Sequence, residues 1–371
     1  MADAQLSGDA LRRYNTARKT QEGGGYLAKH YDANHLFATQ PMNFFRQNAV
    51  VPPSNLAGVR MESKGTVWTD ALDTPQVKSG MSVAQARVKH LAVPTRAGVA
   101  RINFERSTGN EKGAMTFNAG RTGVPVHFLP WESLSVVSLR IPDTGGAFYE
   151  PDDADNPGLF FTAAINGCSV FVRGSTHAPE IFHAGINGEF HEGVSAVTFW
   201  QNRMRDLLAG RGPGGGHPGE LREANKTHYI RDPNNSDPTT TATAASFEQW
   251  LKTNQSDEFR VQAVSAWGCV FGIRFGRAWS FYLQENATTT ILRYVKKQDV
   301  KTVKTNNREE TLLKSTGDVV RTEKVALKRG PFTVNKKIYM ATQTYSRPLQ
   351  IREIFPNGGS AIKIKDEIKR I

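Results

Sequence analysis

A cysteine that could act as a nucleophile follows a turn-forming pair of residues in an apolar segment. Residues 159–173 read LFFTAAINGCSVFVR, in which Asn166 and Gly167 interrupt the apolar run and Cys168 comes directly after them. This pattern predicts a strand, a tight turn and a second strand. A turn of this kind holds a cysteine near backbone N–H groups, which can lower the thiol pKa below its usual ~8.5 and can bind an oxyanion.

A histidine and a threonine stand at spacings that suit this cysteine. The residues after Cys168 predict a hairpin with its loop at 174–179 and a returning strand that carries His183, which would bring the imidazole back toward the sulfur. Thr162, six residues before the cysteine, is a candidate to orient the imidazole. By spacing alone, a buried structural cysteine and an ordinary strand histidine are the more common explanation of the pattern.

The segment TAAINGCSVFVRGSTHAPEIFHAG, residues 162–185, resembles the active-site segment of the cytotoxic necrotizing factor family, to which Burkholderia lethal factor is related. The shared features are a Gly-Cys turn, a hydrophobic strand, a short loop, a histidine on the return strand and a threonine six residues before the cysteine. Asn166 stands where the family usually has serine. Residues 268–284, GCVFGIRFGRAWSFYLQ, resemble the strands that follow the histidine in that domain.

The resemblance implies an α+β fold, in which helices flank a central β sandwich of mixed sheets. It also implies a protein-glutamine deamidase that needs no cofactor or metal. Cys168 would attack a glutamine carboxamide, backbone N–H groups of the Asn166-Gly167 turn and of Cys168 would hold the oxyanion, and His183, oriented by Thr162, would transfer protons. In the family a backbone carbonyl from an earlier strand also orients the histidine. In this sequence the segment 135–137 is the candidate to supply that carbonyl.

The resemblance further implies a partner, a host protein that carries a reactive glutamine. A Rho-type GTPase is favoured, and a translation-initiation helicase is the other candidate. We expect a monomeric bacterial toxin or effector. Residues 1–15 contain no apolar core of a signal peptide and we find no delivery region, so we expect a protein that a bacterium secretes or injects and that acts in the host cytoplasm.

The remaining chain supplies the elements that must position these residues. We divide it into an N-terminal leader, 1–95, and a deamidase-like domain, 96–371. Within the domain we expect a helix over 197–208, a mobile loop over 210–245, a short helix from residue 246, and a second β block over 259–282 with its turn at Gly276-Arg277.

Charge suggests a further partner. The chain of 371 residues has 47 Lys and Arg against 35 Asp and Glu, a net +12. The last 81 residues hold 19 Lys and Arg against 8 Asp and Glu, a net +11. This charge favours an acidic protein or an anionic membrane as a binding partner. Aromatic residues are sparse there, so nucleic acid is disfavoured. The alternative to a deamidase is nevertheless a basic, β-rich nucleic-acid-binding or structural protein without catalysis, and a cysteine protease is a third reading.

Composition excludes several classes. Only two cysteines, Cys168 and Cys269, are present, which is too few for a disulfide framework or a cysteine-rich metal site. The nine histidines lack paired-ligand spacing, so we expect no zinc. Cys269 has no histidine at hairpin distance after it and is expected to be a core thiol. His177, in the hairpin loop, is expected at the surface.

Overall fold

The computed structural model describes residues 33–56, 66–70, 88–91, 97–106, 111–112, 114–120, 123–131, 135–143, 156–185, 200–201, 204, 221–229, 259–305, 308–315, 317–329, 331–357 and 361–363. These parts are mostly strands in large mixed sheets, so the predicted α+β class with flanking helices is wrong. The main cause is the C-terminal third, where three strands continue for 17, 18 and 24 residues because each stays hydrogen-bonded to a long neighbour.

The larger of two main sheets, named the large sheet here, has 11 described strands. Its order is β1 (Ala49–Val50), β6 (Ala114–Ala119), β4 (Gly98–Arg106), β7 (Val124–Leu129), β9 (Leu159–Thr162), β13 (Phe259–Phe275), β14 (Ala278–Val295), β18 (Phe332–Phe355) and β17 (Val320–Arg329). The short strands β5 (Glu111–Lys112) and β19 (Ala361–Lys363) also pair with β18. The β1–β6, β7–β9 and β5–β18 pairs are parallel and the other pairs antiparallel, so the sheet is mixed.

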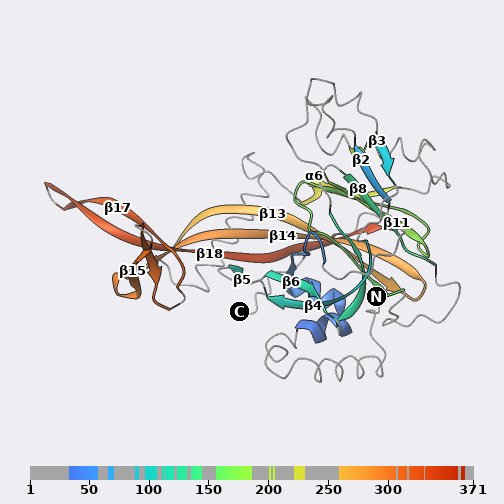
Figure 1. Cartoon of the computed structure of the whole chain (residues 1–371), viewed down its shortest axis with the longest axis horizontal. Helices are drawn as coiled ribbons and strands as arrows, with labels where there is room; N and C mark the ends of the chain where they lie inside the picture. Colours follow the sequence, from blue (N-terminus) through green and yellow to red (C-terminus); the bar gives the residue numbers. More distant parts are fainter. Residues whose placement is uncertain are drawn as a thin grey trace.

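The small sheet lies over one face of the large sheet (Figure 1). Its order is β12 (Arg222–Ala224), β10 (Ser169–Gly174), β11 (Pro179–Gly185), β8 (Ser135–Arg140), β2 (Thr66–Asp70) and β3 (Val88–Leu91). Alternate residues of the facing strands form one apolar core between the sheets. From the large sheet it takes Phe160, Val270, Trp279, Phe281 and Leu283, and from the small sheet Val137, Leu139, Val170, Val172 and Ile181.

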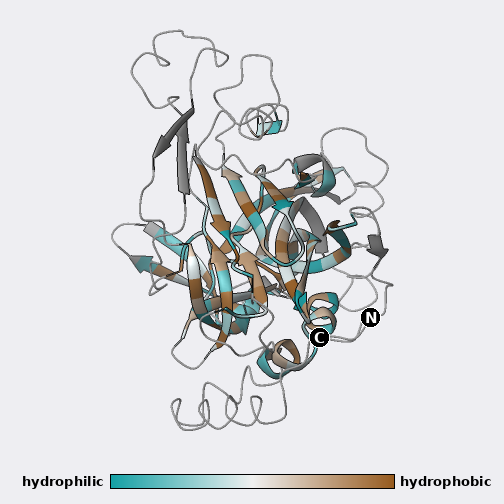
Figure 2. Ribbon diagram, turned by 90° about the vertical axis from the view of Figure 1, so that its right-hand side faces the viewer, coloured by the Kyte–Doolittle hydropathy of each residue, from teal (hydrophilic) through white to brown (hydrophobic). Residues whose placement is uncertain are grey.

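The opposite face of the large sheet carries a second, aromatic core. Phe104, Phe117, Phe161 and Phe271 lie on this face and pack with three phenylalanines of the helical residues 33–47. Those three are Phe37, Phe44 and Phe45, and the ring of Phe45 stacks on that of Phe271 at 3.6 Å between centroids. In Figure 2, hydrophobic and hydrophilic residues alternate along the central strands, as expected for strands whose faces meet different layers.

The helical residues 33–39 and α3 (Pro41–Gln47) belong to the segment that we assigned to an N-terminal leader. They cover the aromatic face of the large sheet, and the rest of the segment is described only at 48–56, 66–70 and 88–91. The division at residue 95 stays a prediction. Within the described parts, no helix combines the length and the apolarity needed to cross a membrane.

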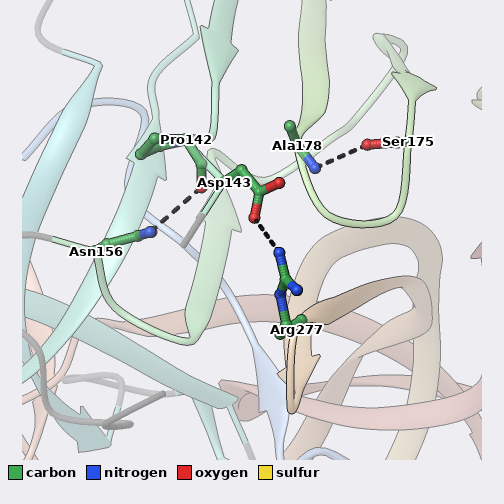
Figure 3. Close-up of polar contacts among 6 residues, drawn as sticks. All are labelled: Pro142, Asp143, Asn156, Ser175, Ala178 and Arg277. Carbon is green, nitrogen blue, oxygen red and sulfur yellow. Dashed lines mark hydrogen bonds and ion pairs between the residues drawn. The ribbon is translucent and has the colours of Figure 1, made fainter. Parts of the chain in front are cut away.

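Loops at one end of the small sheet meet the turn of the β13–β14 hairpin (Figure 3). The guanidinium of Arg277, in that turn, lies 3.4 Å from the carboxylate of Asp143, which follows β8. The Asn156 amide donates to the carbonyl of Pro142 at 3.2 Å, and the loop between β10 and β11 is closed by a bond from the Ala178 N–H to the Ser175 hydroxyl at 3.1 Å. These contacts fix the end of the sandwich that lies away from Cys168.

Several expected local structures are confirmed. The β10–β11 hairpin pairs as expected, with its loop between Gly174 and Pro179, and the β13–β14 turn lies at Gly276-Arg277. The strands on either side of Asn166-Gly167 do form, but they do not pair with each other, because β9 belongs to the large sheet and β10 to the small one. The expected helix over 197–208 is described only at Trp200, Gln201 and Met204, which are helical.

The predicted loop over 210–245 contains described structure. Residues 222–229 form β12, which extends the small sheet beside β10, and α6 (Lys226–Tyr229). The other residues of 210–245, except residue 221, and the helix expected from residue 246 lie outside the described part of the chain.

A buried amide ties the segment 45–50 to the large sheet. The Gln284 side chain donates to the carbonyls of Phe45 and Asn48, at 2.6 and 2.7 Å, and accepts from the N–H of Val50 at 3.0 Å. We predict that Gln284→Met, which keeps the size of the side chain, lowers the free energy of unfolding by about 3–5 kcal/mol, because each buried backbone group that loses its partner costs ~1–3 kcal/mol. Urea unfolding measures this change. Gln298→Met, at an exposed position, is the control and should leave the stability unchanged.

Candidate active site

Cys168 follows a sharp turn that carries the chain from the large sheet to the small sheet. Gly167 adopts a φ of +104°, a backbone conformation that favours glycine, and the position where its Cβ would lie is open. Just before the turn, Ile165 exchanges two backbone hydrogen bonds with Gly268 of β13, both at 2.9 Å. The turn is thus anchored to the large sheet on one side and to β10 on the other.

His183 lies on the same face of the small sheet as Cys168. In the β10–β11 ladder His183 is directly opposite Val170, and Cys168 precedes Val170 by two residues. Cys168 and Val170 both pack in the core between the sheets. A diagonal pair of this kind has its Cα atoms about 7–8 Å apart, within reach of an imidazole and a thiol.

A polar contact crosses the interface between the two sheets at this point. The hydroxyl of Thr162, at the end of β9, lies 2.5 Å from Nδ1 of His183. Both side chains are buried, and Thr162 comes from the large sheet while His183 comes from the small one. Sequence spacing identified both residues, but that they meet across two layers follows from the fold.

The environment of His183 keeps its ring neutral. Its side chain is 1% exposed, and burial, which disfavours the charged imidazolium, lowers its pKa from 6.5 to about 3. Nε2 is buried and makes no hydrogen bond to the described residues. When Nδ1 carries the ring proton and donates it to Thr162, Nε2 presents a lone pair that can accept a proton. On the far side of His183, β8 places Val137 opposite it in register.

Tyr229, which the sequence analysis did not single out, holds the turn that carries Cys168. Its hydroxyl donates to the carbonyl of Cys168 at 2.7 Å and accepts from the N–H of Gly167 at 2.9 Å. Burial raises the pKa of Tyr229, so its hydroxyl stays protonated. No spacing rule could have found it, because α6 lies in a segment that we expected to be a loop.

The bond to Tyr229 bears on the expected oxyanion site. The Gly167 N–H already donates to the Tyr229 hydroxyl, so it can bind an oxyanion only if that hydroxyl moves away. Asn166 is exposed at the outside of the turn. The oxyanion role that we assigned to the turn stays a prediction.

Cys269 and His177 lie where we expected them. Cys269 is completely buried in the aromatic core, on the opposite face of the large sheet from Cys168, and burial raises its thiol pKa. His177 is exposed in the β10–β11 loop. In the described ranges, no three His, Cys, Asp or Glu side chains are grouped so that they could hold a metal ion.

Comparison with known proteins adds little to this geometry. No protein-family model matches the chain, and no curated protein matches it. Among solved structures, the C-terminal domain of CNFy from Yersinia pseudotuberculosis is similar over 73% of this chain and 93% of that chain, with 9% identity and a TM-score of 0.28. This is a weak structural neighbour, and any relation to that toxin domain is distant at most.

The buried imidazole should make stability depend on pH. The unfolded chain takes up a proton at residue 183 between pH 6.5 and about 3, whereas the folded chain does not, so the free energy of unfolding should fall as the pH drops through this window. The slope from this group should approach ~1.4 kcal/mol per pH unit. Urea unfolding from pH 7 to pH 4 should show a shallower slope for His183→Gln than for the wild type. His177→Gln, at an exposed site, should keep the wild-type slope.

The Tyr229 hydroxyl should support both stability and the position of the thiol. Because Tyr229→Phe leaves the Gly167 N–H and the Cys168 carbonyl without their partner, we expect a loss of about 1–3 kcal/mol in the free energy of unfolding. The rate of alkylation of Cys168 in the native state should also change. Tyr294→Phe, at an exposed position, is the matched control for both measurements. Unchanged stability and an unchanged alkylation rate would contradict the role of Tyr229.

Proposed function

We propose that this protein is a glutamine deamidase that uses Cys168 as nucleophile and His183 as general base and acid, with Thr162 orienting the imidazole. One observation carries the proposal: His183 is bonded at Nδ1 to Thr162, has no described hydrogen-bond partner at Nε2, and shares its face of the sheet with Cys168. A nucleophile, a base and a group that orients the base are the parts that thiol catalysis requires.

The reaction can be written with these groups alone. Nε2 of His183 accepts the thiol proton while Sγ of Cys168 bonds to the carboxamide carbon of a glutamine. The tetrahedral intermediate collapses when the same proton passes to the nitrogen, which leaves as ammonia and gives a thioester. Water then loses a proton to Nε2 and attacks the thioester carbon, and the sulfur leaves and recovers the proton. The net change converts a carboxamide and water into a carboxylic acid and ammonia, without a metal or cofactor.

The low pKa of His183 defines the resting state. An imidazole with a pKa of about 3 is neutral near pH 7, so the base is already in the form that can accept a proton. For the same reason, a resting pair of thiolate and imidazolium is disfavoured. The thiol therefore loses its proton to His183 as the sulfur attacks the substrate. The negative charge then moves from the sulfur to the carbonyl oxygen of the substrate, which becomes the oxyanion.

Burial favours a slim substrate group. Cys168 is 6% exposed and His183 1% exposed, so the reacting atoms lie below the described surface. A glutamine carboxamide on its flexible stem needs a narrower opening than the backbone of a protease substrate, which would bring bulk on both sides of the reacting carbon. This argument supports deamidation over proteolysis by the same residues.

A protein without catalysis, in which Cys168 and His183 only pack, is the alternative. The buried Nε2 does not decide between the two, because the indole nitrogen of Trp279, in the same core, is also buried without a described hydrogen-bond partner. The contact of Nδ1 with Thr162, on the face that His183 shares with Cys168, favours catalysis. The resemblance of residues 162–185 to the necrotizing factors supports the same choice. On that resemblance we propose a bacterial toxin or effector that reaches the host cytoplasm, with a Rho-type GTPase as the favoured substrate and a translation-initiation helicase as the second candidate.

Peptide-resolved mass spectrometry tests this function. A lysate of eukaryotic cells, and a purified Rho-type GTPase, would be treated with the wild type, Cys168→Ser and Cys269→Ser. Glutamine-to-glutamate conversion at specific sites should occur with the wild type and with Cys269→Ser, which alters a thiol in the other core, and should be absent with Cys168→Ser. Conversion that survives Cys168→Ser, cleavage of the substrate chain, or no conversion in the lysate would overturn the proposal.

A further inference from the structure

The C-terminal strands form an arm that projects from the body along the long axis of the molecule (Figure 1). The arm consists of β17, the distal half of β18 and the hairpin of β15 (Val300–Thr305) and β16 (Arg308–Leu313). The pairing of β14 with β18 ends at Tyr339, so from Phe332 to Ile338 β18 pairs with β17 alone among the described strands. The tip is therefore a two-stranded ribbon.

Apolar side chains are exposed at the end of this ribbon. Phe332 is 71% exposed and Val334 is 49% exposed. Because they are two residues apart in one strand, they lie on the same face of the ribbon. Phe332 and Val334 thus form an exposed apolar pair at the far end of the strand, outside both cores.

Basic residues lie both beside the apolar tip and behind it. Arg329 is opposite Phe332 in register, and Lys328 is opposite Thr333. Lys324 of β17 is opposite Lys337 of β18, and Lys336 follows Val334 on the same face; all three are exposed. Like charges directly opposite each other destabilise a ribbon, and a bound anion would relieve this repulsion. Residues 296–340 contain 12 Lys and Arg against 5 Asp and Glu, a net +7, so the whole arm attracts anions.

We propose that the tip of this arm binds the surface of an anionic phospholipid bilayer. Phe332 and Val334 enter the boundary between headgroups and acyl chains, and Lys324, Lys336 and Lys337 bind the headgroups. The spacing suits this arrangement: four residues of strand place Lys336 about 14 Å behind Phe332, and apolar groups of interfacial segments lie about 5–10 Å deep. The inference does not depend on the proposed deamidase activity.

The residue types at the tip favour lipid over nucleic acid. A ribbon that binds a nucleic acid would present its lysines to the phosphates, with aromatic rings between them to stack on bases. Here Phe332 is the one aromatic residue in the sequence from 324 to 337, and its apolar neighbour on the same face is a valine, which cannot stack. Insertion of an apolar pair among anionic headgroups, with basic residues beside and behind it, uses both the apolar and the basic side chains.

Vesicle co-sedimentation of the full chain tests the proposal. One set of vesicles contains phosphatidylcholine alone, and the other contains phosphatidylcholine and phosphatidylserine in a two-to-one ratio. The wild type should bind the second set and not the first, and the binding should weaken with salt. Each lysine at an anionic surface contributes roughly a fivefold gain in affinity, so Lys324→Gln/Lys336→Gln/Lys337→Gln should lower it by roughly a hundredfold. Phe332→Ser/Val334→Ser should also lower it, by at least about tenfold.

A matched variant controls for total charge. Lys296→Gln/Lys297→Gln/Lys314→Gln removes the same charge from exposed positions outside the tip ribbon and should lower the affinity far less than the tip triple variant. Circular dichroism would confirm that each variant folds, as expected for exposed positions. Absence of vesicle binding, equal loss in both triple variants, or binding of a DNA duplex by the tip lysines without vesicle binding would overturn the proposal.

Discussion

The contact between Thr162 and His183 is the constraint on which the proposed chemistry depends. It joins two side chains from different sheets in an otherwise apolar core. A hydrogen bond in such surroundings is strengthened by the low local dielectric, and breaking it leaves buried polar atoms unsatisfied. It therefore fixes the orientation of the imidazole, and it can form only when the small sheet is in one position on the large sheet.

That position is set by the layers on either side. The aromatic core on the far face of the large sheet contains Phe104, Phe161 and Phe271, and the helical residues 33–47 close it. Phe161 lies in this core, while its neighbour Thr162 points to the opposite face, where His183 lies. Packing in the aromatic core thus holds the strand that orients the histidine, and Gln284 ties the covering segment to the same sheet.

The long strands link the candidate site to the arm. β13 supplies Gly268, which holds the segment before Cys168, and the next two strands of the sheet, β14 and β18, continue toward the arm. A site on the body and a binding tip on the arm would then be held at a constant separation by continuous backbone hydrogen bonding. If both proposals hold, the arm would bring the active site to substrates close to an anionic membrane.

The sequence by itself determined the local structure around the candidate site. The turn at Asn166-Gly167, the β10–β11 hairpin, the β13–β14 turn and the burial of Cys269 all follow from short-range patterns of turn residues and apolar side chains. These patterns also placed Thr162, Cys168 and His183 in one candidate site. What they describe is the conformation of neighbouring residues, which depends little on the rest of the chain.

Only the tertiary structure decided which sheets these strands join and what surrounds the site. That β9 and β10 lie in different sheets, that Tyr229 from a segment far along the chain holds the cysteine turn, and that the long C-terminal strands make the fold mostly β all depend on pairing between distant segments. The physical reason is that strand pairing and side-chain burial are properties of contacts across the chain. A single strand has the same alternation of residues whichever partner it takes.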